Sequence, residues 1–119
     1  GERIDTDTDQ LRWARGYDHT YILDKELGKL AIASRCSSPK TGIVMEVYTD
    51  QPGVQLYTGN WMSGNLRGKH DHRYPARAAL CLETQHYPDS PNKPEYPSTR
   101  LNPGETFRST TIFRFTLKA

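Results

Sequence analysis

Short stretches of the chain alternate hydrophobic and polar residues, which is the pattern of β-strands that bury one face. Lys29 to Cys36 alternates in this way, and Ile43 to Thr49 does so again after a loop rich in Ser, Pro and Gly. In the second stretch Ile43, Met45 and Val47 fall on one face. Two such stretches around a turn predict an antiparallel hairpin.

Further strand signals lie on both sides of this hairpin. Tyr21 to Leu23 and Val54 to Thr58 are short apolar runs, and Thr106 to Leu117 shows the clearest alternation, with its phenylalanines on one face. Ala78 to Gln85 is ambiguous, because its periodicity fits a strand or a helix and its first residues have helix propensity. The surrounding β pattern favours a strand there.

Two segments read as loops. Residues 59–77 are rich in Gly, Asn, His and Arg, which predicts a long surface loop. Pro88 to Pro103 contains five of the eight prolines, so it can form neither a helix nor a central strand.

About six short strands without a long amphipathic helix predict an all-β fold, an antiparallel β-sandwich. The 119 residues suffice for one domain. Six strands are few for an independent sandwich, so we expect residues 1–119 to be one section of a single larger domain.

Charge and hydropathy exclude several kinds of partner. The net charge is +2, and the 16 Lys and Arg residues are scattered, so no nucleic-acid interface is predicted. No apolar stretch approaches the ~20 residues that span a bilayer, so no membrane partner is expected. The first ten residues do not resemble a signal peptide, but a leader could precede them, so cytoplasmic, periplasmic and secreted locations all stay open.

Two segments resemble metal-binding motifs, but each lacks residues that the motif requires. Asp5 to Asp9 resembles the start of an EF-hand loop, but Gln10 and Gly16 stand where that loop needs Gly and Glu. His70 and His72 could share a face, yet no third ligand follows at a recognisable spacing. We therefore predict no metal.

Three polar residues sit inside or next to apolar β segments and are the candidates for chemistry. Glu83 lies within an apolar run, where half-burial would raise the pKa of its carboxyl toward the range of a general base. Gln55 has apolar neighbours and needs a hydrogen-bond partner. Asp18 directly precedes a strand. Each of them could instead have a purely structural role. Glu83 could be an ion-pair partner, Gln55 a hydrogen-bonded core amide, and Asp18 a cap or turn residue.

Four segments, in order and in register, resemble the aldose 1-epimerase (galactose mutarotase) family. Gly16 to Leu23 reads GYDHTYIL, Tyr48 to Asn60 reads YTDQPGVQLYTGN, Cys81 to Asn92 reads CLETQHYPDSPN, and Leu101 to Glu105 reads LNPGE. The order and spacing of the segments also agree, and the resemblance covers essentially the whole chain.

The resemblance implies a galactose-mutarotase-like β-sandwich, of which residues 1–119 are the C-terminal part. It implies an isomerase that interconverts the α and β anomers of free hexoses such as galactose and glucose. Glu83 would be the catalytic base, and Asp18 and Gln55 would bind the sugar. No metal or organic cofactor is implied.

The family's acidic His and a sugar-binding Arg belong to segments that precede this chain, and none of its four histidines takes the acid's place. We therefore expect the chain alone to be inactive or strongly impaired. Its expected partners are the free sugar and either the missing N-terminal part of the same enzyme or another copy of itself.

Two other functions stay open at this stage. One is a carbohydrate-binding module without turnover, which would not need a base at Glu83. The other is a relative that acts on hexose 6-phosphates and binds phosphate through Arg67, Lys69 and Arg73.

Overall fold

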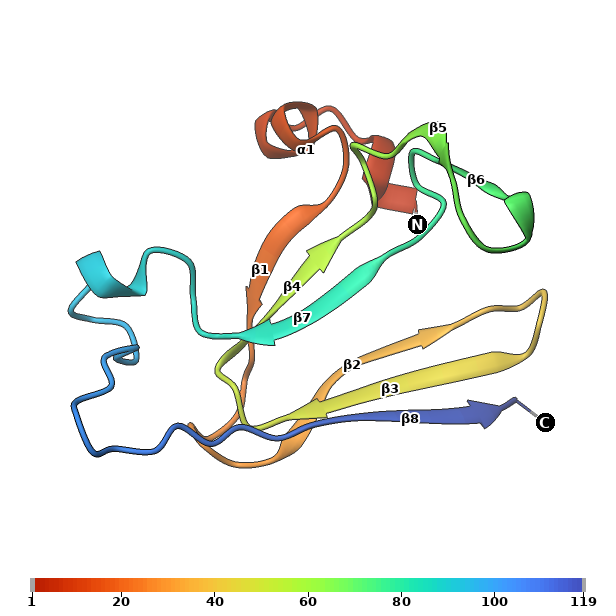
Figure 1. The fold of residues 1–119 in the computed structure, drawn as a ribbon. Helices are drawn as coiled ribbons and strands as arrows, with labels where there is room; N and C mark the ends of the chain where they lie inside the picture. Colours follow the sequence, from red (N-terminus) through yellow and green to blue (C-terminus); the bar gives the residue numbers. More distant parts are fainter. Residues whose placement is uncertain (1, 119) are drawn as a thin grey trace. The chain divides into compact units, whose positions relative to one another are not determined.

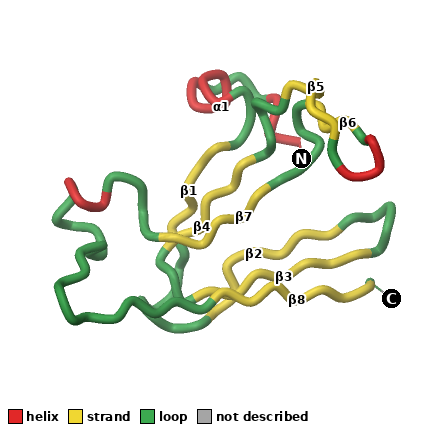
Figure 2. The backbone as a smooth tube through the Cα atoms, in the orientation of Figure 1, coloured by secondary structure: helices red, strands yellow, loops and turns green. Residues whose placement is uncertain are grey.

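The computed structural model describes residues 2–118, which form short strands with little helix (Figures 1 and 2). The strands are β1 (Asp18–Ile22), β2 (Ala31–Ser37), β3 (Ile43–Thr49), β4 (Gly53–Tyr57), β5 (Ser63–Arg67), β6 (Arg73–Pro75), β7 (Cys81–Gln85) and β8 (Thr111–Leu117). The helical elements are the α-helix α1 (Asp9–Ala14) and the 3-10 turns η1 (Glu2–Asp5), η2 (Lys69–Asp71) and η3 (Ser90–Asn92). The predicted all-β class is confirmed.

The strands form three sheets, ordered β1-β4-β7, β2-β3-β8 and β5-β6. By its internal contacts the chain divides into two compact units, Gly1–Thr20 with Gln55–Glu83 and Tyr21–Val54 with Thr84–Ala119. The second unit contains the whole β2-β3-β8 sheet, and the first contains the β5-β6 hairpin. None of the helices formed by the described residues combines the length and the apolar character needed to cross a membrane.

The predicted hairpin is confirmed as β2 and β3, which pair antiparallel, and β8 pairs antiparallel with the other side of β3. Met45 lies opposite Phe115, and Val47 lies opposite Phe113. Residues directly opposite each other share a face, so the apolar positions of β3 and β8 form one apolar surface. Val47 is completely buried.

The opposite face of the same sheet carries a charged ladder. Glu46 lies between Arg35 on β2 and Arg114 on β8. Its carboxylate oxygens are 3.5 Å from the Arg35 guanidinium and 3.7 Å from that of Arg114. Both arginines are largely exposed, so these pairs contribute little stability.

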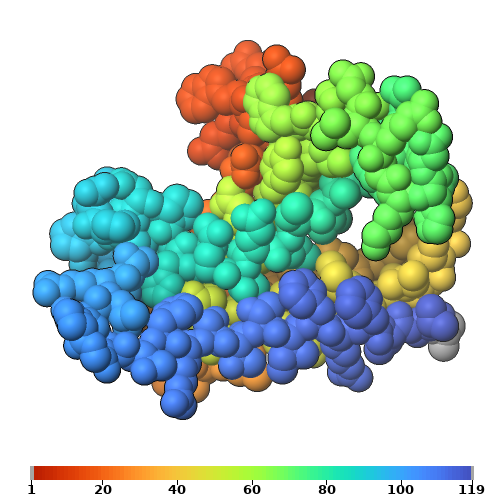
Figure 3. All heavy atoms as spheres, in the orientation of Figure 1, coloured from red at the N-terminus to blue at the C-terminus, as the bar shows by residue number. Residues whose placement is uncertain are grey.

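Strand β8 is an outer strand of its sheet and leaves much of its apolar surface open. Phe113 is 49% exposed and Phe115 is 63% exposed. Figure 3 shows the atoms of this last strand, in dark blue, uncovered along the face in view. Exposed outer strands with large apolar side chains are surfaces that pair with other chains.

The prediction of one long loop over residues 59–77 was wrong, because this segment folds into the β5-β6 hairpin. Its turn requires two residues in left-handed backbone conformations, His70 with φ 54° and Asp71 with φ 61°. The N–H of Gly68 donates to the carbonyl of His72 at 2.8 Å and closes the turn. The polar residues that indicated a loop lie instead in the exposed strands and turn of this hairpin.

Two further differences concern a short helix and the start of the last strand. Helix α1 was not predicted, although Thr8 is a normal N-cap whose hydroxyl accepts from the N–H of Leu11 at 3.4 Å. The last strand begins at Thr111, five residues later than the alternation indicated. The proline-rich segment is irregular apart from η3, as expected.

The Asp50 side chain binds the residues that directly precede β8. Its carboxylate accepts from the Thr110 N–H at 2.8 Å, from the Ser109 hydroxyl at 3.1 Å and from the Gln51 side chain at 3.4 Å. Burial alone would raise the pKa of Asp50, but these hydrogen bonds outweigh it and lower the pKa below its ordinary value of 3.8. Asp50 therefore ties the end of β3 to the start of β8.

We predict that protonation of Asp50 destabilises the fold. A carboxyl whose pKa is lowered in the folded state stabilises that state above its unfolded-state pKa, and the stabilisation is lost as the pH falls through the folded-state pKa. The free energy of unfolding, measured by urea titration, should therefore fall as the pH drops below about 3.8. Asp50→Asn should remove this part of the pH dependence, and Ser109→Ala should reduce it. An unchanged pH profile in Asp50→Asn would contradict the assignment.

Candidate active site

The three residues expected to carry chemistry lie on the three strands of one sheet. Asp18 is on β1, Gln55 on β4 and Glu83 on β7, and β4 lies between the other two strands (Figure 1). All three belong to the first compact unit. Segments that are 37 and 28 residues apart in the sequence therefore meet in one sheet.

Strands β1 and β4 pair antiparallel in a register that two hydrogen bonds fix. The Thr58 N–H donates to the Tyr17 carbonyl at 3.1 Å, and the Leu23 N–H donates to the Pro52 carbonyl at 3.0 Å. In this register Thr20 lies opposite Gln55. Asp18 is two residues before Thr20, so it shares their face.

The side chains on this face are joined by hydrogen bonds. The Gln55 Nε2 group donates to Asp18 Oδ1 at 2.7 Å, and the Thr20 hydroxyl donates to Gln55 Oε1. Gln55 is half-buried and Asp18 is exposed. The expectation that Gln55 needs a partner is thus confirmed, and the partner is the second predicted sugar-binding residue.

Glu83 is exposed, and the expectation that it is half-buried was wrong. The physical reason is its position, because β7 is an outer strand of the β1-β4-β7 sheet among residues 2–118. Within those residues, no hydrogen bond or ion pair holds the Glu83 carboxylate. Its oxygens are therefore open to a molecule that approaches from solvent.

The residues after β4 hold the backbone just ahead of Asp18. The Tyr17 N–H donates to the Thr58 hydroxyl at 3.0 Å, and the Tyr17 carbonyl accepts from Asn60 Nδ2 at 2.8 Å. The Thr58 hydroxyl donates to Asn60 Oδ1 at 2.6 Å, so the two side chains brace each other. Asn60 is only 6% exposed.

Gly16 allows this close approach. Its φ of +143° lies in the region that favours glycine, and a Cβ atom there would stand 2.2 Å from Asn60 Oδ1. Gly16 and Asn60 stand within the motif segments, but the resemblance implies no role for either. The available signal was a polar residue, Asn60, three residues after the end of an apolar strand.

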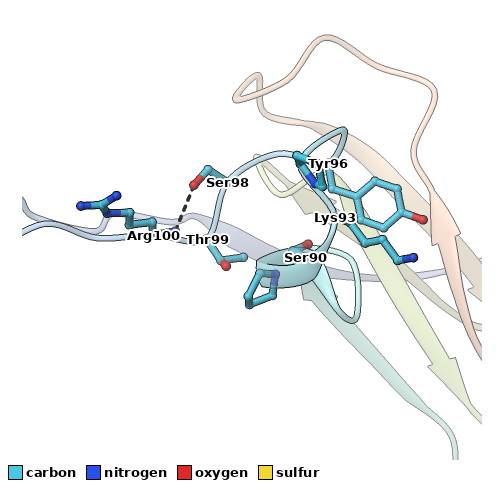
Figure 4. A pocket seen from close by; sticks show the side chains of 8 residues that line it. Ser90, Lys93, Tyr96, Ser98, Thr99 and Arg100 are labelled. Carbon is cyan, nitrogen blue, oxygen red and sulfur yellow. Dashed lines mark hydrogen bonds between the residues drawn. The ribbon is translucent and has the colours of Figure 1, made fainter.

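A separate pocket of about 560 Å³ lies in the proline-rich segment of the second unit and contains none of the three predicted site residues. Figure 4 shows that the Arg100 side chain points away from Lys93 and Tyr96. The pocket therefore lacks a converging set of charged groups. The described residues also contain no group of three or more His, Cys, Asp or Glu side chains placed to hold a metal ion.

Comparison with known proteins connects this geometry to a chemistry. The family model described as aldose 1-epimerase matches residues 1–114. A galactose mutarotase of Mus musculus is 46% identical over 102 residues, which cover 86% of this chain and 30% of the relative. An aldose 1-epimerase of Escherichia coli strain K12 is 36% identical over 110 residues, which cover 90% of this chain and 31% of the relative.

The fold agrees with these sequence matches. The crystal structure of an aldose epimerase homologue from C. elegans superposes with a TM-score of 0.75 at 25% identity, covering 87% of this chain and 30% of that one. The chain spans about 30% of the length of the curated relatives that it matches.

We predict that Gly16→Ala destabilises the chain by two separable effects. The unfavourable φ should cost about 1–3 kcal/mol of unfolding free energy, and the contact with Asn60 should add to that cost. Gly28→Ala is the matched control, because Gly28 has a φ of +73° but no atom within 4 Å of the added Cβ. Urea denaturation should show a larger loss for Gly16→Ala than for Gly28→Ala.

The Asn60→Ala background separates the two effects. There the contact with Asn60 is absent while the Thr58 hydroxyl stays 2.9 Å from the added Cβ, so Gly16→Ala should cost less than it does in the wild-type background. Equal costs for Gly16→Ala in both backgrounds would show that the close approach of Asn60 does not matter.

Proposed function

The chain belongs to the aldose 1-epimerase family, and on that premise we propose that it is the base-bearing, C-terminal part of an enzyme that interconverts the α and β anomers of free hexoses such as galactose and glucose. The observation that carries the proposal is the position of Asp18, Gln55 and Glu83 on the three strands of one sheet. Residues 1–119 would then form part of one β-sandwich domain.

In the proposed reaction Glu83 takes the proton from the anomeric hydroxyl of the bound sugar. As the C1–O1 bond gains carbonyl character, the C1–O5 bond breaks, and an acid outside this chain, a His in the family, protonates O5. The aldehyde end rotates, and O5 attacks its other face while the two protons return. Only protons are transferred, so a positioned base and acid suffice.

Asp18 and Gln55 are proposed to bind the sugar. A carboxylate accepts hydrogen bonds, and an amide both donates and accepts, which suits the dense hydroxyl groups of a pyranose. In the structure their hydrogen-bonding groups face each other, and the exposed Asp18 leaves this pair open to solvent. A sugar hydroxyl would replace the bond between them.

The hexose-6-phosphate alternative is not favoured. Of the three basic residues considered for it, Arg67 pairs with both oxygens of Asp71. Arg73 donates to the Gly64 carbonyl at 3.4 Å. The binding-module alternative is not favoured either, because the matching relatives are named as a galactose mutarotase and an aldose 1-epimerase.

Glu83→Gln tests the proposed base. The amide keeps the shape of the side chain but cannot take a proton, so kcat for mutarotation of α-galactose should fall about 10²–10⁴-fold with little change in KM. Polarimetry on the natural full-length product, corrected for the spontaneous reaction, measures both. Glu95→Gln is the matched control, since Glu95 is an exposed residue of the proline-rich segment. Wild-type kcat in Glu83→Gln would exclude Glu83 as the base.

We further propose that the open apolar side of β8 is covered by the N-terminal part of the same enzyme, or by a second copy when the chain is alone. The exposed Phe113 and Phe115 support this. The isolated chain should therefore elute as a concentration-dependent oligomer in size-exclusion chromatography with light scattering. A monodisperse monomer that melts cooperatively would contradict this proposal.

A further inference from the structure

Thr20 is in direct contact with the proposed sugar-binding pair, but neither the motif resemblance nor the family comparison gives it a role. Its hydroxyl donates to Gln55 Oε1, while the other end of the same amide donates to Asp18. We propose that Thr20 is a positioning residue that fixes the orientation of the Gln55 amide for sugar binding. The inference rests on the proposed function and deepens it.

The direction of the hydrogen bonds follows from chemistry. A carboxylate only accepts, so the group of Gln55 that faces Asp18 must be the donor, Nε2. Oε1 then faces Thr20, and it only accepts, so Thr20 must donate. A flipped amide would bring Oε1 against the Asp18 carboxylate and leave Nε2 to the Thr20 hydroxyl. The Asp18 carboxylate therefore selects this orientation, and the Thr20 hydroxyl, which can donate or accept, holds the Gln55 amide in it by donating to Oε1.

This orientation specifies what the site can bind. A sugar hydroxyl placed between the two side chains would donate to Asp18 Oδ1 and accept from Gln55 Nε2, which replaces both ends of the 2.7 Å bond seen here. A hydroxyl can do both, whereas a fluorine at the same place offers no proton to Asp18. The substrate must carry a free hydroxyl at this point.

The role of Thr20 is separable from the strand pairing. Other groups hold the two ends of β1, namely Thr58 with Asn60 at Tyr17, and the Pro52 carbonyl at the Leu23 N–H. Valine has the branched shape of threonine and also favours strands. Thr20→Val should therefore keep β1 paired with β4 while it removes the donor to Gln55.

The test compares Thr20→Val with Thr20→Ser in the natural full-length product, by polarimetry with α-galactose. Thr20→Val should raise KM about three- to tenfold, the effect of losing one hydrogen bond, with kcat changed less than about twofold because binding rather than proton transfer is weakened. Thr20→Ser keeps the hydroxyl and should restore KM to near the wild-type value. Thr116→Val, at an exposed position of β8, is the matched control and should leave both constants unchanged.

Three results would overturn the inference. They are a wild-type KM in Thr20→Val, equal impairment in Thr20→Val and Thr20→Ser, and a lower kcat at unchanged KM, which indicates loss of folded enzyme. The galactose affinity of the same variants, measured by calorimetric titration, tests the role of Thr20 independently of the proposed catalytic function. Wild-type protein that binds galactose without accelerating mutarotation would contradict the proposed function, while a weaker affinity in Thr20→Val alone would still support the role of Thr20.

Discussion

The hold of β4 on the start of β1 is the interaction on which the proposed site depends. Thr58 and Asn60 bind both backbone groups of Tyr17, and this sets the register that places Thr20 opposite Gln55. A shift of one residue would turn Asp18 to the other face of the sheet and separate it from Gln55. The glycine at position 16 permits this contact, so two segments of the motif resemblance, around Asp18 and around Gln55, are parts of one structural device.

The polar residues of this sheet have different proposed roles, in sugar binding and in proton transfer. Gln55 is half-buried and engaged at both ends of its amide, so it is well oriented before a sugar arrives. Glu83 is open on its outer strand, as a base must be if it is to reach a hydroxyl of an incoming molecule. Preorganised binding groups and an accessible base in one sheet are compatible with a proton-transfer isomerase, and the chemistry requires no covalent intermediate with the protein.

Alternation of residues predicted the β2-β3 hairpin and the shared apolar face of β3 and β8, because a two-residue period is a local property. It failed over residues 59–77, where the β5-β6 turn depends on left-handed conformations at His70 and Asp71, residues that composition alone assigns to loops. The site residues came from motif resemblance. The exposure of Glu83 could not be predicted, since it follows from which strand ends the sheet, and the role of Thr20 follows from a register that the sequence does not display.

The most direct test of the central claim is polarimetry of α-galactose with the natural full-length product, whose intact mass is determined on the same sample. Our account predicts a product longer than 119 residues that speeds the approach to anomeric equilibrium in proportion to its concentration. A product that leaves the spontaneous rate unchanged at every concentration, with galactose and with glucose, would contradict it.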